Sequence, residues 1–240
     1  MRLVYALGLI LLSALPLLIG CSGSNPSQAT LSLDAAHEPS PVQVRETLRR
    51  LATARPDSFL VTRVRQGGLT PTFGTRFRLA SGAVAAFIPG RHPVRGQELV
   101  MVVARGEGVP GAALIATARI LAARAGRSLS PERTVLVVFL PPPAQGDALT
   151  ALFAAPPWTR DHVAAMLLIE PDEVMAGRAE ARAAEQGWAL QFIEETSEPQ
   201  GDVSAVLALA RATVHAALLV ADTGQQTADF PRPDASVPSQ

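Results

Sequence analysis

The chain contains no lysine, a single cysteine and no excess of either charge. Its 21 basic residues are all arginines, and 21 acidic residues balance them. A neutral chain without a stripe of basic side chains gives no electrostatic support to nucleic-acid binding. One cysteine excludes an internal disulfide framework and a cysteine-based zinc knuckle. The 240 residues are 48% hydrophobic, which is enough for the core of one ordinary domain with additional terminal segments.

The amino terminus combines one positive charge with a short apolar run. Arg2 is followed by residues 3–19, which are mostly apolar. A membrane-spanning helix needs about 20 apolar residues, so the run is somewhat short for a permanent span, and Pro16 disfavours an unbroken helix. The residues that follow, Leu18-Ile19-Gly20-Cys21, resemble the lipobox of bacterial lipoproteins. In that motif a small residue precedes a cysteine whose sulfur accepts a diacylglyceryl group.

Two interpretations of this segment are open. It could be an ordinary signal peptide or anchor helix that contains a cysteine by chance, or it could be a lipoprotein signal. The only cysteine of the chain falls at the lipobox position, which favours the second. We therefore expect cleavage between Gly20 and Cys21, acylation of Cys21, and a lipid bilayer as the partner of the acylated end. Ser22 is typical of delivery to the outer membrane, which predicts an envelope protein that faces the periplasm.

Composition divides the chain into four segments. Residues 1–20 are the predicted signal peptide, and residues 21–41 are a flexible tether rich in Ser, Pro, Ala and Asn. Residues 42–222 are the folded domain, and residues 223–240 are a polar tail expected to be disordered.

Hydrophobic patterns within the domain predict an α/β fold. Leu99–Val103, Val135–Phe139 and Val163–Ile169 are continuous apolar runs, which are typical of strands buried on both faces of a sheet. Strands that alternate with helices predict a three-layer α/β/α sandwich with a mixed, largely parallel sheet. The other expected elements are a helix from Ser40-Pro41 to about Ala54, a strand over 59–64, a hairpin over 77–88, helices over 111–123, 147–154, 177–186 and 203–219, and a strand over 188–193.

The segment Ala83–Gly90 reads as a strand that ends in a proline-glycine turn. This segment, and the order of elements up to about Pro171, resemble the core of the co-catalytic di-zinc aminopeptidases, the superfamily that includes glutaminyl cyclases. The resemblance implies a zinc-binding His after the strand at 99–103, where this chain has Arg105, followed by Glu107. It also implies a metal-bridging Asp in a loop before the next helix, and only residues 108–110 remain of that loop.

The remaining family positions are also altered. Pro143 and Ala144 stand where the resemblance places the general base and a ligand Glu, and Glu170 stands where it places a ligand Asp. The candidate for the last ligand, His215, falls inside a predicted helix. A two-metal hydrolase needs several N or O ligands and a carboxylate base. We therefore expect a truncated, degenerate site without a metal or other cofactor.

Two functions follow as alternatives. The first is a non-catalytic binding or scaffold module, a pseudoenzyme of the aminopeptidase type tethered to the envelope, with an unknown envelope protein as a possible partner. The second is a metallopeptidase-like hydrolase with an unorthodox site at Glu107 and Glu170, because carboxylates at strand ends can act as acid and base. A structural interpretation of the same residues is that they are solvated, or that Glu107 pairs with Arg105.

Overall fold

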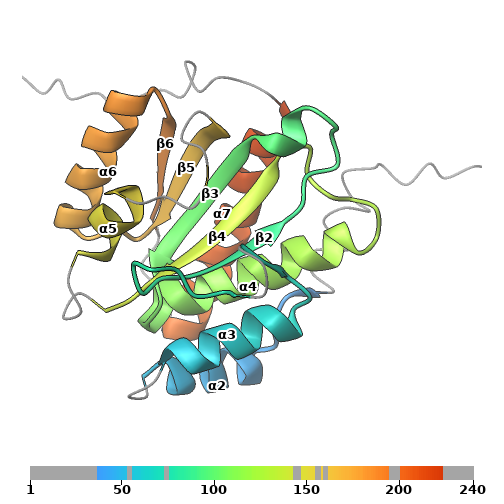
Figure 1. Cartoon of the computed structure of the whole chain (residues 1–240). Helices are drawn as coiled ribbons and strands as arrows, with labels where there is room; N and C mark the ends of the chain where they lie inside the picture. Colours follow the sequence, from blue (N-terminus) through green and yellow to red (C-terminus); the bar gives the residue numbers. More distant parts are fainter. Residues whose placement is uncertain are drawn as a thin grey trace, which may run out of the picture.

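A six-stranded sheet forms the centre of the computed structural model (Figure 1). The structure describes residues 37–52, 56–72, 76–142, 147–154, 158, 162–194 and 201–223. The strand order is β1-β2-β4-β3-β5-β6; the β1–β2 and β2–β4 pairs are antiparallel and the other three pairs are parallel. The strands are β1 (Thr70–Pro71), β2 (Val84–Ile88), β3 (Leu99–Arg105), β4 (Thr134–Leu140), β5 (Val163–Ile169) and β6 (Ala189–Ile193).

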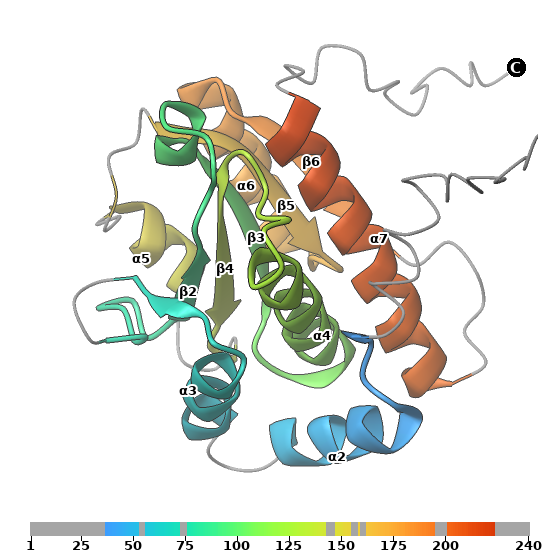
Figure 2. The same ribbon diagram turned by 90° about the vertical axis from the view of Figure 1, so that its right-hand side faces the viewer.

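Helices cover both faces of this sheet (Figure 2). Two long helices pack on one face, with two shorter amino-terminal helices against the first of them, and two further helices cover the opposite face. The predicted three-layer sandwich with a mixed, largely parallel sheet is therefore confirmed. On the first face lie α2 (Pro41–Leu51), α3 (Pro56–Gln66), α4 (Gly108–Ala125) and α7 (Asp202–Thr223), and on the second α5 (Ala148–Ala154) and α6 (Glu173–Gln186).

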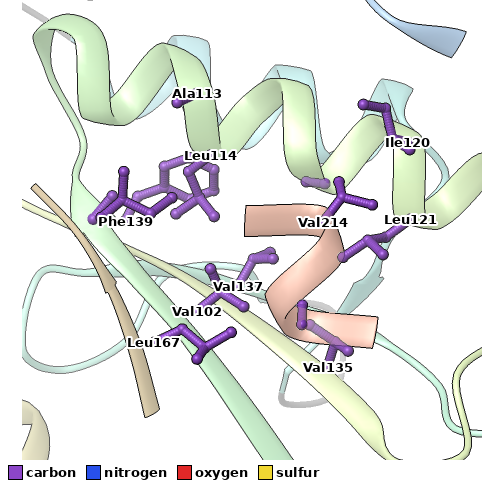
Figure 3. Packing of buried hydrophobic residues seen from close by; sticks show 14 of the residues in the cluster. Val102, Ala113, Leu114, Ile120, Leu121, Val135, Val137, Phe139, Leu167 and Val214 are labelled. Atoms are coloured by element: carbon purple, nitrogen blue, oxygen red, sulfur yellow. The ribbon is translucent and has the colours of Figure 1, made fainter. Parts of the chain in front are cut away.

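The strands at the centre of the sheet are buried on both faces. Val102 of β3 and Leu167 of β5 point toward Leu114 of α4 and Val214 of α7 in one apolar core (Figure 3). Met101, next to Val102 in the sequence, belongs to a second apolar core beneath α5 and α6. Burying one such side chain contributes about 1.5–3 kcal/mol. Two cores therefore explain why these strands have continuous apolar runs in place of alternating ones.

The segment at 59–64 is a helix, and the prediction of a strand there was wrong. It forms the centre of α3, which begins at Pro56 with Asp57 in its first turn. Leu60 and Val64 lie four residues apart and are both buried, as one face of a helix requires. A short apolar run cannot distinguish a strand from a helix, and here Pro56 at the first helical position was the stronger signal.

The predicted hairpin over 77–88 is present in a reduced form. β2 provides its second arm, and the first arm contributes an isolated antiparallel bridge between Arg78 and Val84. Gly82 has a φ of 82°, the left-handed conformation that a tight turn of this kind requires.

The amino-terminal helix begins at Pro41, as the sequence predicts, and ends at Leu51, before the expected Ala54. The Ser40 side chain accepts a hydrogen bond from the N–H of Gln43. Just before this helix, the Glu38 carboxylate accepts two hydrogen bonds from the Arg211 guanidinium of α7, at 2.5 and 2.8 Å. The predicted signal peptide, Gly20, Cys21, most of the tether and most of the tail lie outside the described residues.

Within the described part of the chain, residues 202–222 of α7 are the one stretch long and apolar enough to cross a membrane, with a mean hydropathy of 1.9. Half of that stretch is buried. It packs on α4 and the sheet, as the core helix of a globular domain does.

Candidate functional site

The carboxyl ends of the parallel strands bring several predicted site residues to one edge of the sheet. β3 ends at Arg105, β4 ends at Leu140, and Glu170 directly follows β5. The N–H of Gly106 donates to the carbonyl of Leu140 at 2.7 Å, which holds the ends of β3 and β4 together. Ligands of open α/β sheets bind at this edge, so it is the candidate site.

The connection from β3 to α4 is shorter than the sequence indicates. Only Gly106 and Glu107 separate the two elements, and residues 108–110, expected as the remnant of a loop, form the first turn of α4. Glu107 is the N-cap residue of α4, but its side chain makes no capping hydrogen bond. This connection leaves no room for a metal-binding loop.

Arg105 is held by a carboxylate from the other side of the site. Its Nη2 donates to Oδ2 of Asp172 at 2.5 Å, and its Nη1 donates to the carbonyl of Pro141 at 3.5 Å. The suggested pairing of Arg105 with Glu107 is therefore replaced by a pairing with Asp172. Only 18% of the Arg105 side chain is exposed, so the guanidinium is fixed between the ends of β3, β4 and β5.

Asp172 is also the N-cap residue of α6. Its Oδ1 accepts a hydrogen bond of 2.7 Å from the N–H of Met175, so one carboxylate both pairs with Arg105 and caps the helix. The hydrogen bond from Arg105, followed by that from Met175, lowers the pKa of Asp172 because both favour the charged form. Asp172 is therefore an anion at neutral pH.

A second ion pair lies beside the first. Arg178 of α6 contacts Asp147, which directly precedes α5 and accepts a hydrogen bond of 3.1 Å from the N–H of Thr150. Burial raises the pKa of Asp147, but hydrogen bonds from Thr150 and Arg178 outweigh this and lower it overall. The two ion pairs join β3, α5 and α6 around the mouth of the site.

The two ion pairs border an open pocket of about 620 Å³. Its lining combines apolar side chains with two arginines and three carboxylates, and consists of Arg105, Leu140, Asp147, Ala148, Leu149, Asp172, Glu173, Val174, Met175 and Arg178. Most of these charges already neutralise one another within the protein. The pocket can therefore contact a ligand through both polar and apolar groups.

The described residues do not fit a pair of zinc ions. Among them, no three side chains of His, Cys, Asp or Glu lie close enough to hold one metal ion. Arg105 stands where the resemblance places a zinc-binding His, and its guanidinium is a permanent cation that would repel a dication. Pro143 and Ala144, which stand where two Glu are implied, lie outside the described residues.

Two further residues named from the resemblance do not complete a site. Glu170 has a φ of 42°, and its N–H donates to the carbonyl of Ile193 at 3.0 Å. His215 lies on the exposed side of α7, a helix that packs on the face of the sheet and not at its carboxyl edge.

Two residues of the site that sequence reasoning missed carry a partial local signal. Asp172 and Asp147 each directly precede a helix, the position at which a carboxylate is expected as a cap. Their pairing with Arg105 and Arg178 joins residues 67 and 31 positions apart, so no local pattern could have predicted it.

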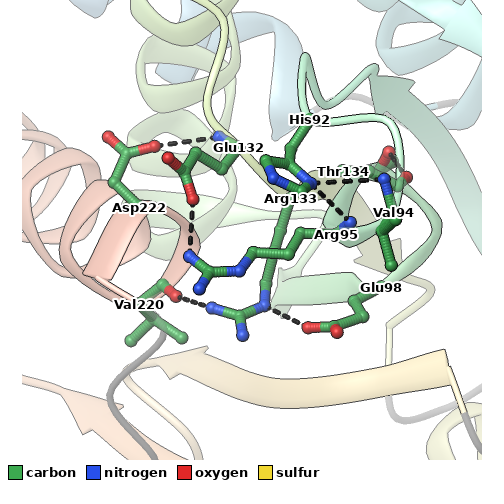
Figure 4. Close-up of polar contacts among 10 residues, drawn as sticks. His92, Val94, Arg95, Glu98, Glu132, Arg133, Thr134, Val220 and Asp222 are labelled. Carbon is green, nitrogen blue, oxygen red and sulfur yellow. Dashed lines mark hydrogen bonds and ion pairs between the residues drawn. The ribbon is translucent and has the colours of Figure 1, made fainter.

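A second polar cluster lies at the opposite, amino end of the strands (Figure 4). The Arg133 guanidinium donates to Glu98 at 2.5 Å and to the carbonyl of Val220, near the end of α7, at 2.7 Å. The Nδ1 atom of His92 accepts hydrogen bonds from the N–H groups of Val94 and Arg95. Arg133 thus joins the residues before β3 and β4 to α7, and His92 orders its own loop, so the cluster has a structural role.

Comparison with known proteins gives a match in fold alone. No family model and no curated protein sequence matches the chain. The solved structure of the LapA aminopeptidase of Legionella pneumophila matches with a TM-score of 0.52 and 7% identity, over 82% of this chain and 76% of LapA. The glutaminyl cyclase of Porphyromonas gingivalis matches with a TM-score of 0.48 and 12% identity, over 74% of this chain and 98% of the cyclase. The similarity to LapA supports the fold expected from the sequence resemblance.

Proposed function

We propose that this protein is a lipid-anchored protein of the cell envelope whose aminopeptidase-like domain binds a partner or ligand without hydrolysing it. The observation that carries the non-catalytic part is the ion pair between Arg105 and Asp172. Arg105 of this pair stands at the end of β3, where the resemblance to the di-zinc aminopeptidases implies a zinc-binding His. The pocket beside the ion pair is accessible, which supports a binding role for this domain.

Electrostatics supports this interpretation of Arg105. A guanidinium keeps its charge at every physiological pH, so it cannot become a metal ligand by losing a proton. A dication bound beside this guanidinium would be repelled by its charge. Both oxygens of the Asp172 carboxylate already accept hydrogen bonds within the protein, so neither is free to serve as a metal ligand.

The anchor is supported by the sequence Leu18-Ile19-Gly20-Cys21. Each buried methylene of an acyl chain contributes about 0.8 kcal/mol to membrane binding, so two or three chains anchor stably where one does not. Ser22 supports location at the outer membrane, facing the periplasm.

The second candidate is a hydrolase that uses Glu107 and Glu170. One observation favours it: Glu170 is one of two described residues other than glycine with a positive φ, and such conformations concentrate at functional sites. The position of Glu107 at the start of α4 is compatible with either function.

Metal analysis of the purified full chain distinguishes the two candidates. We expect no stoichiometric zinc and no hydrolysis of aminoacyl anilides. Near-stoichiometric zinc that is lost in Glu107→Ala or Glu170→Ala would contradict the non-catalytic proposal and support the hydrolase. Glu173→Ala is the matched control, because this exposed carboxylate lies beside the same pocket.

The anchor has a separate test. Cys21→Ala should abolish labelling of the protein by radioactive fatty acid and leave the precursor uncleaved. Ser22→Ala alters the adjacent residue and should keep both labelling and cleavage. Labelling that persists in Cys21→Ala would exclude the proposed anchor.

A further inference from the structure

β6 lies at one edge of the sheet (Figure 1). Among the described residues it pairs with β5 alone, and the carbonyl of Ile193 accepts the N–H of Glu170 from the β5 side. Backbone groups alternate sides along a strand, so those of Gln191 also face β5, whereas those of Leu190 and Phe192 point away from the sheet. Across the described residues, no backbone hydrogen bond from outside the sheet reaches Leu190 or Phe192.

The two edges of the sheet differ in how they are protected. Natural edge strands are usually short, or carry charges, proline or a bulge that prevents pairing with another chain. β1, at the other edge, consists of two residues, one of which is Pro71. β6 is five residues long, its sequence ALQFI has neither charge nor proline, and its register with β5 is regular. Of the two edges, β6 is therefore the one suited to accept another strand.

Gln191, at the centre of β6, provides an independent observation. Its Oε1 is shielded from water and has no hydrogen-bond partner in the described part of the chain. Leaving a shielded polar atom without a partner costs about 1–3 kcal/mol. A neighbouring strand that presents an amide at this level would remove that cost.

We propose that a second copy of this chain pairs with β6 through its own β6, antiparallel, about a two-fold axis at Gln191. In this register Leu190 lies opposite Phe192 of the partner subunit, and the outward backbone groups of both residues form the hydrogen bonds. Gln191 lies opposite Gln191 of the partner subunit as a non-hydrogen-bonded pair, with Cα atoms about 4.5 Å apart. The two side-chain amides are then close enough to bond to each other after they reorient.

The occupant is a second copy because the strand complements itself. A two-fold axis at Gln191 places Leu190 opposite Phe192 of the partner subunit and Gln191 opposite its own symmetry mate, so apolar side chains meet apolar side chains and an amide meets an amide. β6 has no charge, so the pairing brings no like charges together. The pairing uses no residue of the strand-end pocket, so it leaves that pocket open in both subunits.

Disulfide crosslinking of the full chain tests the register. Gln191→Cys places two thiols opposite each other at a separation within the range of roughly 4.4–6.8 Å between Cα atoms that a disulfide needs. We expect mild oxidation to convert this variant to a covalent dimer. In Ala189→Cys, on the same face of the strand, the two thiols are offset by about 13 Å along the strands. This variant should therefore form no more covalent dimer than the unmodified chain.

Three results would overturn the proposal: no dimer from Gln191→Cys, equal dimer from both variants, or crosslinking to a different protein. Sedimentation equilibrium of the detergent-solubilised chain provides a test without cysteine substitution. The unmodified chain should have the mass of a dimer, and Leu190→Pro, which removes an outward N–H, should be a monomer. A monomeric unmodified chain at micromolar concentration would also overturn it.

Discussion

Nη2 of Arg105, at the end of β3, lies 2.5 Å from Oδ2 of Asp172, at the start of α6. The Arg105 side chain is largely buried, whereas 47% of the Asp172 side chain is exposed. Partly exposed pairs of this kind contribute about 0.2–1 kcal/mol to stability. The pair has a second consequence, because it fixes the Arg105 guanidinium at the edge of the sheet, where the resemblance places a zinc-binding His.

The two roles of Asp172 can be separated by substitution. Asp172→Asn keeps a side-chain oxygen that caps α6 but loses the charge, so we expect unfolding free energy to fall by about 0.2–1 kcal/mol. Asp172→Ala also loses the cap, which adds about 1 kcal/mol. Urea unfolding measures both. Glu173→Gln, at the next residue, should change stability by less than about 0.5 kcal/mol. Equal losses in the two Asp172 variants would show that the cap contributes nothing.

The contribution of Asp172 should depend on pH. Its pKa is lower in the folded protein than the ordinary value of about 3.9, first because of Arg105 and then because of the Met175 N–H. A lowered folded pKa gives stability that is fully present above the unfolded pKa and is lost as pH falls through the folded pKa. The difference in unfolding free energy between the unmodified chain and Asp172→Asn should therefore be constant from pH 7 to about 5 and shrink below about 4. A difference that stays unchanged at pH 3 would contradict this account.

Arg133 should matter more to stability than an exposed arginine. Its side chain is 11% exposed and bonds both Glu98 and the carbonyl of Val220, near the end of α7 (Figure 4). Arg133→Met removes both bonds, and we expect a loss of about 1–3 kcal/mol in chemical unfolding. The unfolding free energy of Arg133→Lys should lie between those of the unmodified chain and Arg133→Met, because an ammonium lacks the forked guanidinium that reaches both acceptors. Arg127→Met, at an exposed position, is the control and should be neutral.

The fold was predictable where local pattern and burial agree. The apolar runs at 99–103, 135–139 and 163–169 became the central strands because helices cover both of their faces. The run at 59–64 was misassigned because its length suits either element, and the packing of Leu60 and Val64 against the core selected a helix.

The candidate site was predictable in position but not in its contacts. Strand ends could be located from the apolar runs, which identified Arg105, Glu107 and Glu170 as neighbours of one edge. The acceptor of Arg105 could not be identified, because Asp172 reaches it only when β3 and β5 are adjacent in the sheet. The backbone of Glu170 was likewise unpredictable, since its positive φ reflects the turn that follows β5.

Substitution of two helical glycines by alanine should change the unfolding free energy in opposite directions. A Cβ on Gly111 of α4 would lie 2.9 Å from the carbonyl oxygen of Arg105 and 2.9 Å from the backbone of Gly106, and neither can move without displacing the end of β3. Gly111→Ala should therefore lower the unfolding free energy by about 1–3 kcal/mol. A Cβ on Gly177 of α6 meets nothing within 4 Å, so Gly177→Ala should raise it by about 0.5–1 kcal/mol through the higher helix propensity of alanine. Stabilisation by both substitutions would show that α4 is not held against β3 as closely as the structure places it, and that the position of Arg105 is correspondingly less fixed.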